Sequence, residues 1–269
     1  MVWDVLTREI DRAVAARSAG PDSPGRDSAG PGSAAPGLAA PGVAAPGVAV
    51  RGDAAVLQVV DAGGGTGGFA VPLAQAGHDV TVVDASPDAL AALTRRAAEA
   101  GVADRIRAFQ GDADALADLV PAESADLVLC HSVLEVVDSP AEAVGALAGV
   151  LRRGGAASVL VANRAAAVLG RAMGGHLADA LGLLRDPEGH WGVRDTLRRR
   201  YDVDTLTTLL TKAGLAVEEV HGVRVVADLV PAVVLEREHE MLIEFERAVA
   251  DRSPYRDVAT QLHVLARRP

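Results

Sequence analysis

Apolar and polar residues alternate in two kinds of block over most of the chain after residue 55. Short runs rich in valine, leucine and isoleucine predict β-strands, which we expect at residues 56–62, 79–84, 105–110, 125–130 and 156–162. Stretches with apolar residues at helical spacing predict helices at residues 68–76, 87–100 and 140–151. Strands that alternate with helices pair in parallel through right-handed crossovers, so the pattern predicts an α/β fold with a Rossmann-like, doubly wound sheet.

The C-terminal part of the chain changes character. It predicts helices at residues 203–213 and 232–250, and strands at residues 216–226 and 260–266. A strand, a long helix and a closing strand suit an antiparallel edge hairpin with inserted helical material. We therefore predict a seven-stranded sheet, with a core at residues 53–164 and a C-terminal helical substrate lobe, including the closing strands, at residues 165–269.

The N-terminal part divides into two segments. Trp3, Leu6 and Ile10 recur at helical spacing, which predicts a helix within residues 1–18. Residues 19–52 consist largely of glycine, proline, alanine and serine, and repeat the unit Ala-Ala-Pro-Gly. Proline removes a backbone donor and glycine carries a high ordering entropy, so these units cannot hold a helix or a central strand. We expect residues 19–52 to be a flexible linker.

Composition narrows the class of protein. The chain has 269 residues and a formal net charge of −10. Its single cysteine excludes an intramolecular disulfide framework and a multi-cysteine zinc site. We expect no signal peptide, because the N-terminus mixes acidic and basic residues, and no apolar stretch reaches the ~18 residues of a membrane span. A cytoplasmic protein without membrane association is expected. The acidic balance argues against sequence-independent nucleic-acid binding.

A glycine-rich segment joins the first predicted core strand to the next helix. It reads Val59-Val-Asp-Ala-Gly-Gly-Gly-Thr-Gly-Gly-Phe69, so it presents backbone amides without obstructing side chains. The dinucleotide pattern G-x-G-x-x-G is satisfied by Gly63, Gly65 and Gly68. The acidic-x-G-x-G-x-G loop of S-adenosylmethionine (SAM) binding is equally satisfied by Asp61, Gly63, Gly65 and Gly67. The glycines alone leave both cofactors open.

Acidic residues at the ends of three successive strands favour SAM. Asp61 would repel a pyrophosphate but can pair with the methionyl ammonium of SAM. Asp84 ends the second strand and can accept both ribose hydroxyls. Asp112 follows the third strand, where it can accept from the adenine amine while the Ala113 amide meets a ring nitrogen. The nicotinamide pattern lacks this third position, so we predict SAM as the cofactor.

The motifs of residues 56–163 resemble those of the class I SAM-dependent methyltransferases. They include Val-Val-Asp-Ala-Gly-Gly-Gly-Thr-Gly, Val-Val-Asp-Ala-Ser, Gly-Asp-Ala and Leu151-Arg-Arg-Gly-Gly155. A narrower likeness, to the bacterial tRNA carboxymethoxyuridine methyltransferase family, is carried by His131-Ser-Val-Leu-Glu135, Gly222-Val-Arg-Val225, Ser253-Pro-Tyr255 and His263-Val-Leu-Ala-Arg267. Members of that family esterify the carboxylate of a modified wobble uridine.

The resemblance implies a methyltransferase that uses SAM and acts on tRNA. Carried over by motif, the cofactor-binding residues are Gly63, Gly64, Asp84, Ala85, Asp112, Ala113, Asp114 and His131, of which His131 would face the transferring methyl group. The chain departs from the family at Val136 and Val161-Ala162, where the family has aromatic residues that could stack on bases. A small-molecule O- or N-methyltransferase and a non-catalytic SAM-binding protein are therefore the alternatives.

The candidate catalytic residues are His131 and Arg224. A carboxylate acceptor is already ionised at neutral pH, so a positioned cation is enough, and Arg224 is our candidate. The arginine fork binds carboxylate or phosphate with two parallel hydrogen bonds, which predicts an acceptor-binding rim at Arg194, Arg198, Arg199, Arg200 and Tyr201. With a hydroxyl or amine acceptor, His131 becomes the natural general base. No residue pattern indicates a metal site.

Overall fold

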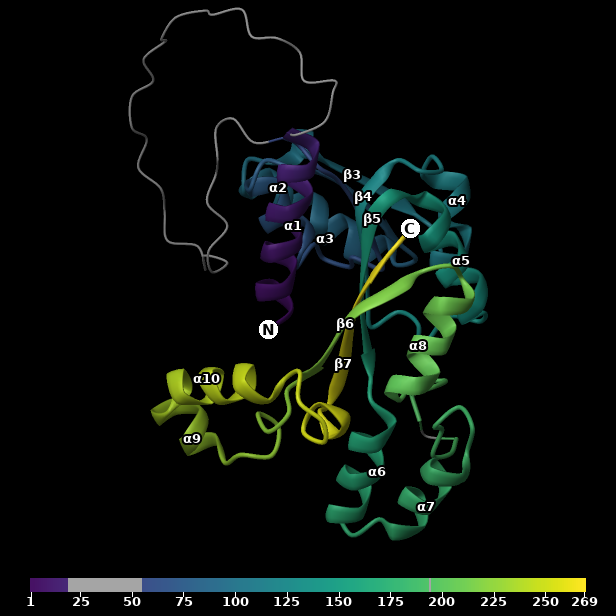
Figure 1. Ribbon diagram of the computed structural model, residues 1–269, viewed down its shortest axis with the longest axis vertical. Coiled ribbons are helices and arrows are strands. Elements are labelled where there is room, and N and C mark those ends of the chain that lie inside the picture. Colours follow the sequence, from purple (N-terminus) through teal and green to yellow (C-terminus); the bar gives the residue numbers. More distant parts are fainter. Residues whose placement is uncertain (19–54, 194) are drawn as a thin grey trace, which may run out of the picture.

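One seven-stranded sheet organises the molecule, whose computed structural model describes residues 1–18, 55–193 and 195–269 (Figure 1). The strand order is β3-β2-β1-β4-β5-β7-β6. The parallel strands are β1 (Gln58–Ala62), β2 (Asp79–Asp84), β3 (Ile106–Gln110), β4 (Ala125–His131) and β5 (Leu151–Ala162). The predicted doubly wound sheet is confirmed, and β2 has the predicted bounds. The predicted linker at residues 19–52 lies outside the described residues.

Two antiparallel strands complete the sheet. β7 (Gln261–Arg267) lies between β5 and β6 (Ala216–Val223) and runs antiparallel to both, which confirms the predicted edge hairpin. β5 begins five residues before the predicted strand, at Leu151. Its first residues lack apolar alternation, but the Gly154 amide donates to the carbonyl of Arg268 at 2.7 Å and extends the pairing.

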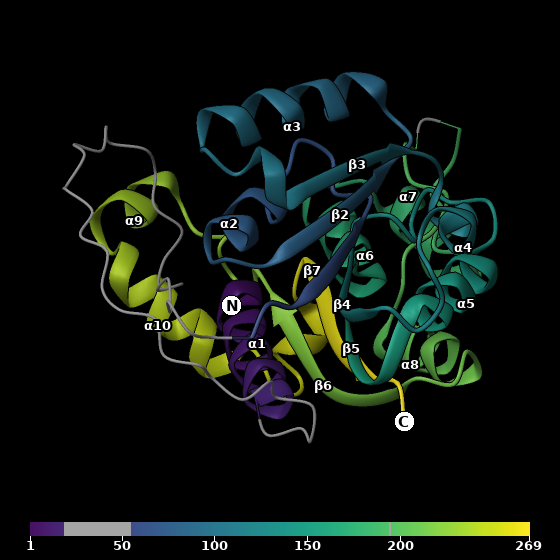
Figure 2. The same ribbon diagram turned by 90° about the horizontal axis from the view of Figure 1, so that it is seen from above.

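Helices cover both faces of the sheet (Figure 2). One face carries α1 (Val2–Ser18), α2 (Ala70–Gln75) and α3 (Pro87–Glu99), and the other carries α4 (Leu116–Leu119), α5 (Pro140–Val150) and α8 (Val203–Lys212). Successive strand residues alternate between the two cores: Leu127 and Leu129 face α1 and α2, whereas Val128 and Cys130 face α5 and α8. The N-terminal helix, predicted from its apolar spacing, is confirmed as α1.

Among the described residues, four helices lie outside these two layers. They are α6 (Arg164–Met173), α7 (Leu177–Arg185), α9 (Ala232–Arg237) and α10 (His239–Val249), and they extend beyond the end of the sheet as two pairs (Figure 1). The prediction of one helix over residues 232–250 is wrong, because Glu238 leaves the helical region at φ −124° and ψ 32°. The apolar spacing continues through this break. No helix within the described ranges is long and apolar enough to cross a membrane.

A buried carboxylate at the start of β4 joins the first strands to α1. Asp126 is 1% exposed, and its oxygens accept from the Gln58 backbone amide at 2.7 Å and from Arg17 at 2.9 Å. Arg152 of β5 forms a second ion pair with the same carboxylate. A buried charge is tolerated only when it is paired and hydrogen-bonded, and Asp126 meets that condition through three different elements.

Replacing this carboxylate should destabilise the fold. We expect Asp126→Asn to lower the free energy of unfolding by about 3 kcal/mol, because Arg17 and Arg152 lose a shared buried partner. Urea-induced unfolding measures the effect. The control is Asp79→Asn, which removes the exposed ion pair of Asp79 with Arg105 and should cost less than about 1 kcal/mol. Equal losses in the two variants would contradict the role assigned to Asp126.

Candidate functional site

The glycine loop leaves β1 at the carboxyl edge of the sheet. Gly63 and Gly65 adopt positive φ angles of 76° and 53°, which favour glycine. A Cβ on Gly63 would lie 2.1 Å from Cγ2 of Val133, and a Cβ on Gly64 would lie 2.6 Å from Oδ2 of Asp61. The loop therefore needs glycine both for its conformation and for its close approach to the strands beside it.

Asp84 fastens this loop to the end of β2. Its Oδ2 accepts from the Gly65 amide and its Oδ1 accepts from the Ser86 amide, both at 2.8 Å. Each carboxylate oxygen has a second lone pair left for a ligand hydroxyl. The prediction that Asp84 binds the ribose stays a prediction, but the carboxylate also shapes the loop that would surround the cofactor.

Of the three acids at the strand ends, Asp61, Asp84 and Asp112, Asp61 is the buried one. It is 3% exposed, and its Oδ2 has no hydrogen-bond partner among the described residues. Burial, reinforced by the nearby charge of Asp84, raises the pKa of Asp61 to about 7. A buried carboxylate without a partner is costly, and a cationic ligand group would relieve that cost.

The third acidic position follows β3. Asp84 pairs with Gln110 across β2 and β3, so the Asp112 to Asp114 turn begins beside the end of β2. Asp112 and Asp114 are exposed and Ala113 is buried. Ala85 is exposed, and its carbonyl accepts from the Gln110 side chain at 3.4 Å. The structure thus brings the predicted cofactor residues of three strands to one edge of the sheet.

His131 ends β4 at the same edge. Its Nε2 lies 2.8 Å from the Ser158 hydroxyl, and its Nδ1 is buried without a partner among the described residues. Burial lowers the pKa of His131 to about 4, so the ring is neutral near pH 7. Phe69 packs edge-on against the ring at 4.7 Å between centroids, and Trp3 of α1 packs on Phe69 at 4.9 Å.

Glu135 also belongs to this region and was not among the predicted site residues. It is 2% exposed, and its Oε1 accepts from the Ala162 amide at the end of β5 at 2.7 Å. Its backbone carbonyl accepts from the amides of Arg198 and Arg199. The available signal was its place in the His-Ser-Val-Leu-Glu motif, although the motif alone does not show that the carboxylate is buried.

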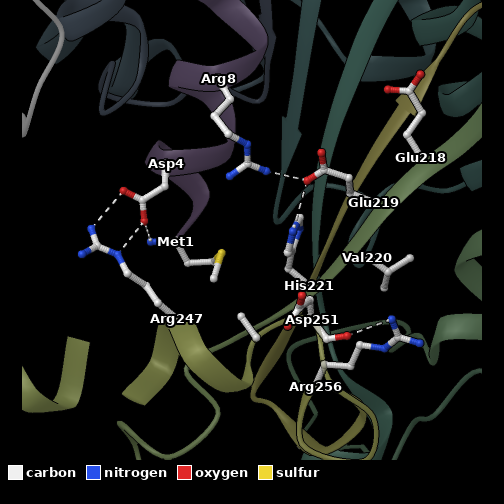
Figure 3. A pocket seen from close by; sticks show the side chains of 11 residues that line it. Met1, Asp4, Arg8, Glu218, Glu219, Val220, His221, Arg247, Asp251 and Arg256 are labelled. Carbon is white, nitrogen blue, oxygen red and sulfur yellow. Dashed lines mark hydrogen bonds and ion pairs between the residues drawn. The ribbon is translucent and has the colours of Figure 1, made fainter. Parts of the chain in front are cut away.

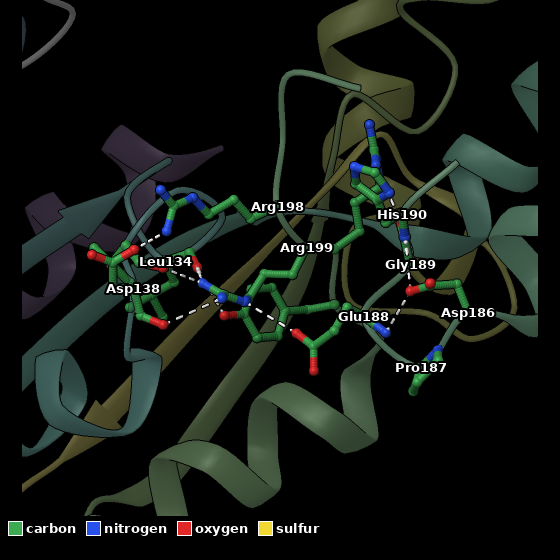
Figure 4. A network of polar contacts seen from close by, with 12 residues as sticks. Leu134, Asp138, Asp186, Pro187, Glu188, Gly189, His190, Arg198 and Arg199 are labelled. Atoms are coloured by element: carbon green, nitrogen blue, oxygen red, sulfur yellow. Dashed lines mark hydrogen bonds and ion pairs between the residues drawn. The ribbon is translucent and has the colours of Figure 1, made fainter. Parts of the chain in front are cut away.

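The described residues of the predicted arginine rim bind other groups of the protein, as Figure 4 shows for Arg198 and Arg199. Arg198 pairs with Asp138, and Arg199 binds the Leu134 carbonyl at 3.2 Å and the Glu188 carboxylate at 3.1 Å. Arg200 pairs with Asp195, and the buried Tyr201 hydroxyl donates to the Leu134 carbonyl. The contacts of Arg198, Arg199 and Tyr201 with Leu134 and Asp138 tie residues 198–201 to the segment after β4. The acceptor-binding role of the four residues stays a prediction, and Arg194 lies outside the described residues.

Arg224 lies just after β6. It adopts a positive φ of 60°, and its side chain is more than half exposed and forms an ion pair with Asp228. Asp228 in turn accepts from the Thr260 hydroxyl at 2.7 Å. Asp228 and Thr260 line a cavity of about 460 Å³ that starts at Ala162 at the end of β5 and is otherwise mostly apolar.

The residues at the carboxyl edge fit SAM. A backbone-lined loop suits its methionine part, the partnerless Oδ2 atom of Asp61 suits its ammonium, and the Asp84 carboxylate has lone pairs for ribose hydroxyls. The neutral His131 ring adds a buried nitrogen that also needs a partner. Sheet order and site together define the class I methyltransferase fold.

Comparison with known proteins agrees with this class. Residues 60–159 match the family described as "Methyltransferase domain". The chain is 29% identical over 216 residues to the tRNA 5-carboxymethoxyuridine methyltransferase of Escherichia coli (strain K12), which covers 79% of this chain and 80% of that protein. It is 31% identical over 169 residues to a ubiquinone biosynthesis O-methyltransferase of Xylella fastidiosa, which covers 62% of this chain and 64% of that protein.

Solved structures share the fold. A SAM-dependent methyltransferase from Mesorhizobium loti superposes with a TM-score of 0.55 at 22% identity, covering 79% of this chain and 91% of that one. A protein described as a putative SAM-dependent methyltransferase from Listeria monocytogenes gives a TM-score of 0.54 at 19% identity, covering 79% and 90%. Residues 60–159 are therefore a methyltransferase domain, the fold is that of SAM-dependent methyltransferases, and these similarities indicate SAM as the methyl donor.

The buried charge of Asp61 should oppose folding and favour ligand binding. Its raised pKa means that the folded protein holds a proton that the unfolded chain has already released, so stability falls as pH rises from about 4 to 7. We expect ligand-free Asp61→Asn to unfold at a higher temperature than the wild type at pH 8, with the difference shrinking toward pH 4. A shift of about three pKa units corresponds to roughly 4 kcal/mol as an upper limit.

The same substitution should weaken SAM binding about tenfold or more, since a charge-assisted hydrogen bond is lost. Calorimetric titration with SAM measures the affinity. Asp88→Asn is the matched control, because Asp88 is exposed in the first turn of α3, and it should change neither property. A variant that is less stable than the wild type at pH 8 would contradict the assignment.

Proposed function

We propose that this methyltransferase esterifies the carboxylate of a modified wobble uridine in tRNA, in the cytoplasm. The observation that carries the proposal is the low pKa of His131, about 4, caused by burial. A general base works best with a pKa near the working pH, so His131 is a weak base near pH 7. A carboxylate acceptor is already ionised there and needs no base.

The extent of the sequence likeness supports the same acceptor. The similarity to the Escherichia coli tRNA 5-carboxymethoxyuridine methyltransferase covers 79% of the chain, whereas that to the Xylella fastidiosa ubiquinone biosynthesis O-methyltransferase covers 62%. The resemblance noted in the sequence also includes motifs in β6, in β7 and before β7, outside the cofactor-binding core. Substrate recognition in such folds resides in segments beyond the shared core.

The chain's own residues would orient the two reactants. SAM, when bound, supplies an electrophilic methyl group. Asp61 and Asp84 would hold the cofactor by its ammonium and ribose, and Phe69, which contacts both Trp3 and His131, would cover the His131 side of the site. Arg224 would hold the acceptor carboxylate for in-line attack, so alignment rather than proton removal does the catalytic work.

Arg224 has two features that suit this role. Its positive φ of 60° is costly for a residue with a side chain, and such strain is concentrated at functional sites. Its present partner Asp228 lines the cavity at the end of β5. An acceptor carboxylate entering that cavity could replace Asp228 on the arginine fork, and Asp228 would keep the hydrogen bond it accepts from Thr260.

A small hydroxyl-bearing molecule is the second candidate acceptor. The cavity of about 460 Å³ has a mostly apolar lining, including Ala166, Leu169, Met173 and Leu229. Cavities of this size and character hold small organic molecules. The relatives in ubiquinone biosynthesis are named as O-methyltransferases. In that case the Nδ1 atom of His131 would accept the hydroxyl proton.

Labelled methyl transfer separates the two candidates. Purified protein is incubated with methyl-labelled SAM and either bulk bacterial tRNA or a small-metabolite extract, and the label is located. We expect base-labile label in tRNA, since a carboxyl ester is cleaved by mild base. Label confined to the metabolite fraction would refute the tRNA proposal and favour the second candidate.

Substitutions of Arg224 should separate activity from stability. Arg224→Ala and Arg224→Gly both remove the guanidinium and should lower kcat/KM for tRNA about a hundredfold, equivalent to about 2.7 kcal/mol. Only the glycine variant relieves the positive φ, so it should be more stable than the alanine variant by about 1 kcal/mol in urea unfolding. Near wild-type activity in both variants would exclude Arg224 from acceptor binding.

A further inference from the structure

A row of polar side chains crosses four strands on the α1 face of the sheet. Ser158 of β5 lies between two histidines, with its hydroxyl 2.8 Å from Nε2 of His131 and 2.8 Å from Nε2 of His263. His263 of β7 then contacts His221 of β6, with 3.5 Å between their Nδ1 atoms. His221 and His263 are directly paired in the strand register, and their rings stack.

The middle of this row is completely enclosed. Ser158 and His263 are 0% exposed, and His221 is 8% exposed. Buried hydroxyl and imidazole groups are costly unless they are hydrogen-bonded, so these groups are stable only as a connected chain. Neither the cofactor contacts nor the acceptor contacts proposed above use Ser158, His263 or His221.

The outer end of the row reaches the surface (Figure 3). Nε2 of His221 lies 3.2 Å from Oε2 of Glu219, and the same oxygen accepts from Arg8 of α1 at 2.7 Å. These three residues line an open cavity of about 610 Å³. The row therefore runs from a surface carboxylate to the ring that ends β4 at the cofactor edge.

The carboxylate fixes the direction of every hydrogen bond in the row. Glu219 can only accept, so Nε2 of His221 must donate and its Nδ1 must accept. Nδ1 of His263 then donates to His221, and its Nε2 accepts from the Ser158 hydroxyl. The Ser158 oxygen is left to accept from Nε2 of His131, so Nδ1 of His131 carries no proton.

The protonation state of the rings agrees with this assignment. Burial lowers the pKa of His131, His221 and His263, so each ring holds one proton near pH 7 and must place it on one nitrogen. With a single proton per ring, a donor at one end requires an acceptor at the other. The opposite direction would place the unprotonated Nε2 of His221 against the Glu219 carboxylate, which is repulsive.

We propose that Ser158, His263, His221 and Glu219 are positioning residues that hold His131 as its Nε2–H tautomer and present an Nδ1 lone pair to the positively charged part of SAM. The inference rests on the proposed place of His131 beside the cofactor. An Nδ1–H in that position would point a positive edge at a cationic ligand, whereas a lone pair attracts it. Glu219 thus sets the polarity of the cofactor site from the far edge of the sheet.

Nitrogen NMR of the ligand-free protein tests the tautomer directly. Protein labelled with ¹⁵N-histidine, with ring signals assigned through single His-to-Gln variants, reports which ring nitrogen carries the proton. We expect protons on Nε2 of His131, Nδ1 of His263 and Nε2 of His221. A proton on Nδ1 of His131 in the wild type would overturn the proposal. The measurement needs neither SAM nor tRNA, so it stands apart from the acceptor question.

Two variants test whether the row sets the tautomer. Glu219→Met removes the acceptor at the partly exposed end of the row and should let His131 populate both tautomers. Glu218→Met is the matched control, since Glu218 lies in the same cavity but binds Arg267 and Arg12 instead of a histidine. An unchanged His131 tautomer in Glu219→Met, or an equal change in Glu218→Met, would overturn the role of Glu219.

Affinity for SAM gives the functional readout. Ser158→Ala breaks the row beside His131 and should weaken SAM binding about tenfold in calorimetric titration, while Glu219→Met should weaken it less, through the mixed tautomers. If the tautomer shifts but affinity for SAM does not, the row positions His131 for something other than the cofactor, and this inference fails. Absence of methyl transfer to tRNA would refute only the proposed acceptor.

Discussion

The parallel register of β1 with its two neighbours is the constraint on which the site depends. Ala62 at the end of β1 pairs with Val83 of β2 on one side and with Cys130 of β4 on the other. Asp84 follows Val83 and His131 follows Cys130. The strand register alone therefore places both residues at the edge of the sheet where the glycine loop begins. No long-range side-chain contact is needed to assemble them, because the backbone ladders of three strands already fix their relative positions.

Two buried aspartates show how the same strands separate stability from function. Asp126 at the starting edge of the sheet is surrounded by Arg17, Arg152 and the Gln58 amide, and so it joins elements together. Asp61 at the opposite edge is equally buried, but it has a partnerless oxygen and a raised pKa. Asp126, with its partners, stabilises the starting edge of the sheet, whereas the fold tolerates the partnerless Oδ2 of Asp61 at the opposite edge. A buried acid without a partner is the arrangement expected of a ligand site.

Local sequence signals predicted the helices, strands and loops, but they did not predict the side-chain contacts between them. The β2 strand, the Ser86-Pro87 helix start and the glycine loop were readable because each is decided by a few adjacent residues. The break between α9 and α10 at Glu238 could not be predicted, because the apolar spacing of α9 continues without interruption into α10. The arginines at 198–200 were predicted as an acceptor-binding rim, but the sequence did not show their partners Asp138, Glu188 and Asp195, which are brought to them by folding of the loops. The histidine row required the register of four strands, although Ser158 was a visible polar residue within an apolar strand.

The N-terminal helix connects the features that the sheet keeps apart. Its arginines meet acids on two strands, with Arg8 on Glu219 and Arg12 on Glu218 of β6, and Arg17 on Asp126 of β4. Its first turn reaches α10 through the pair of Asp4 with Arg247, and Trp3 covers Phe69 beside His131. The exposed ion pairs of Arg8 and Arg12 contribute little individually, so the apolar contacts of Val5, Leu6 and Ile10, together with the buried Arg17–Asp126 pair, must supply most of the docking free energy. The charges then fix where the helix sits, and that placement brings one end of α1 to the histidine row and to the cofactor edge at once.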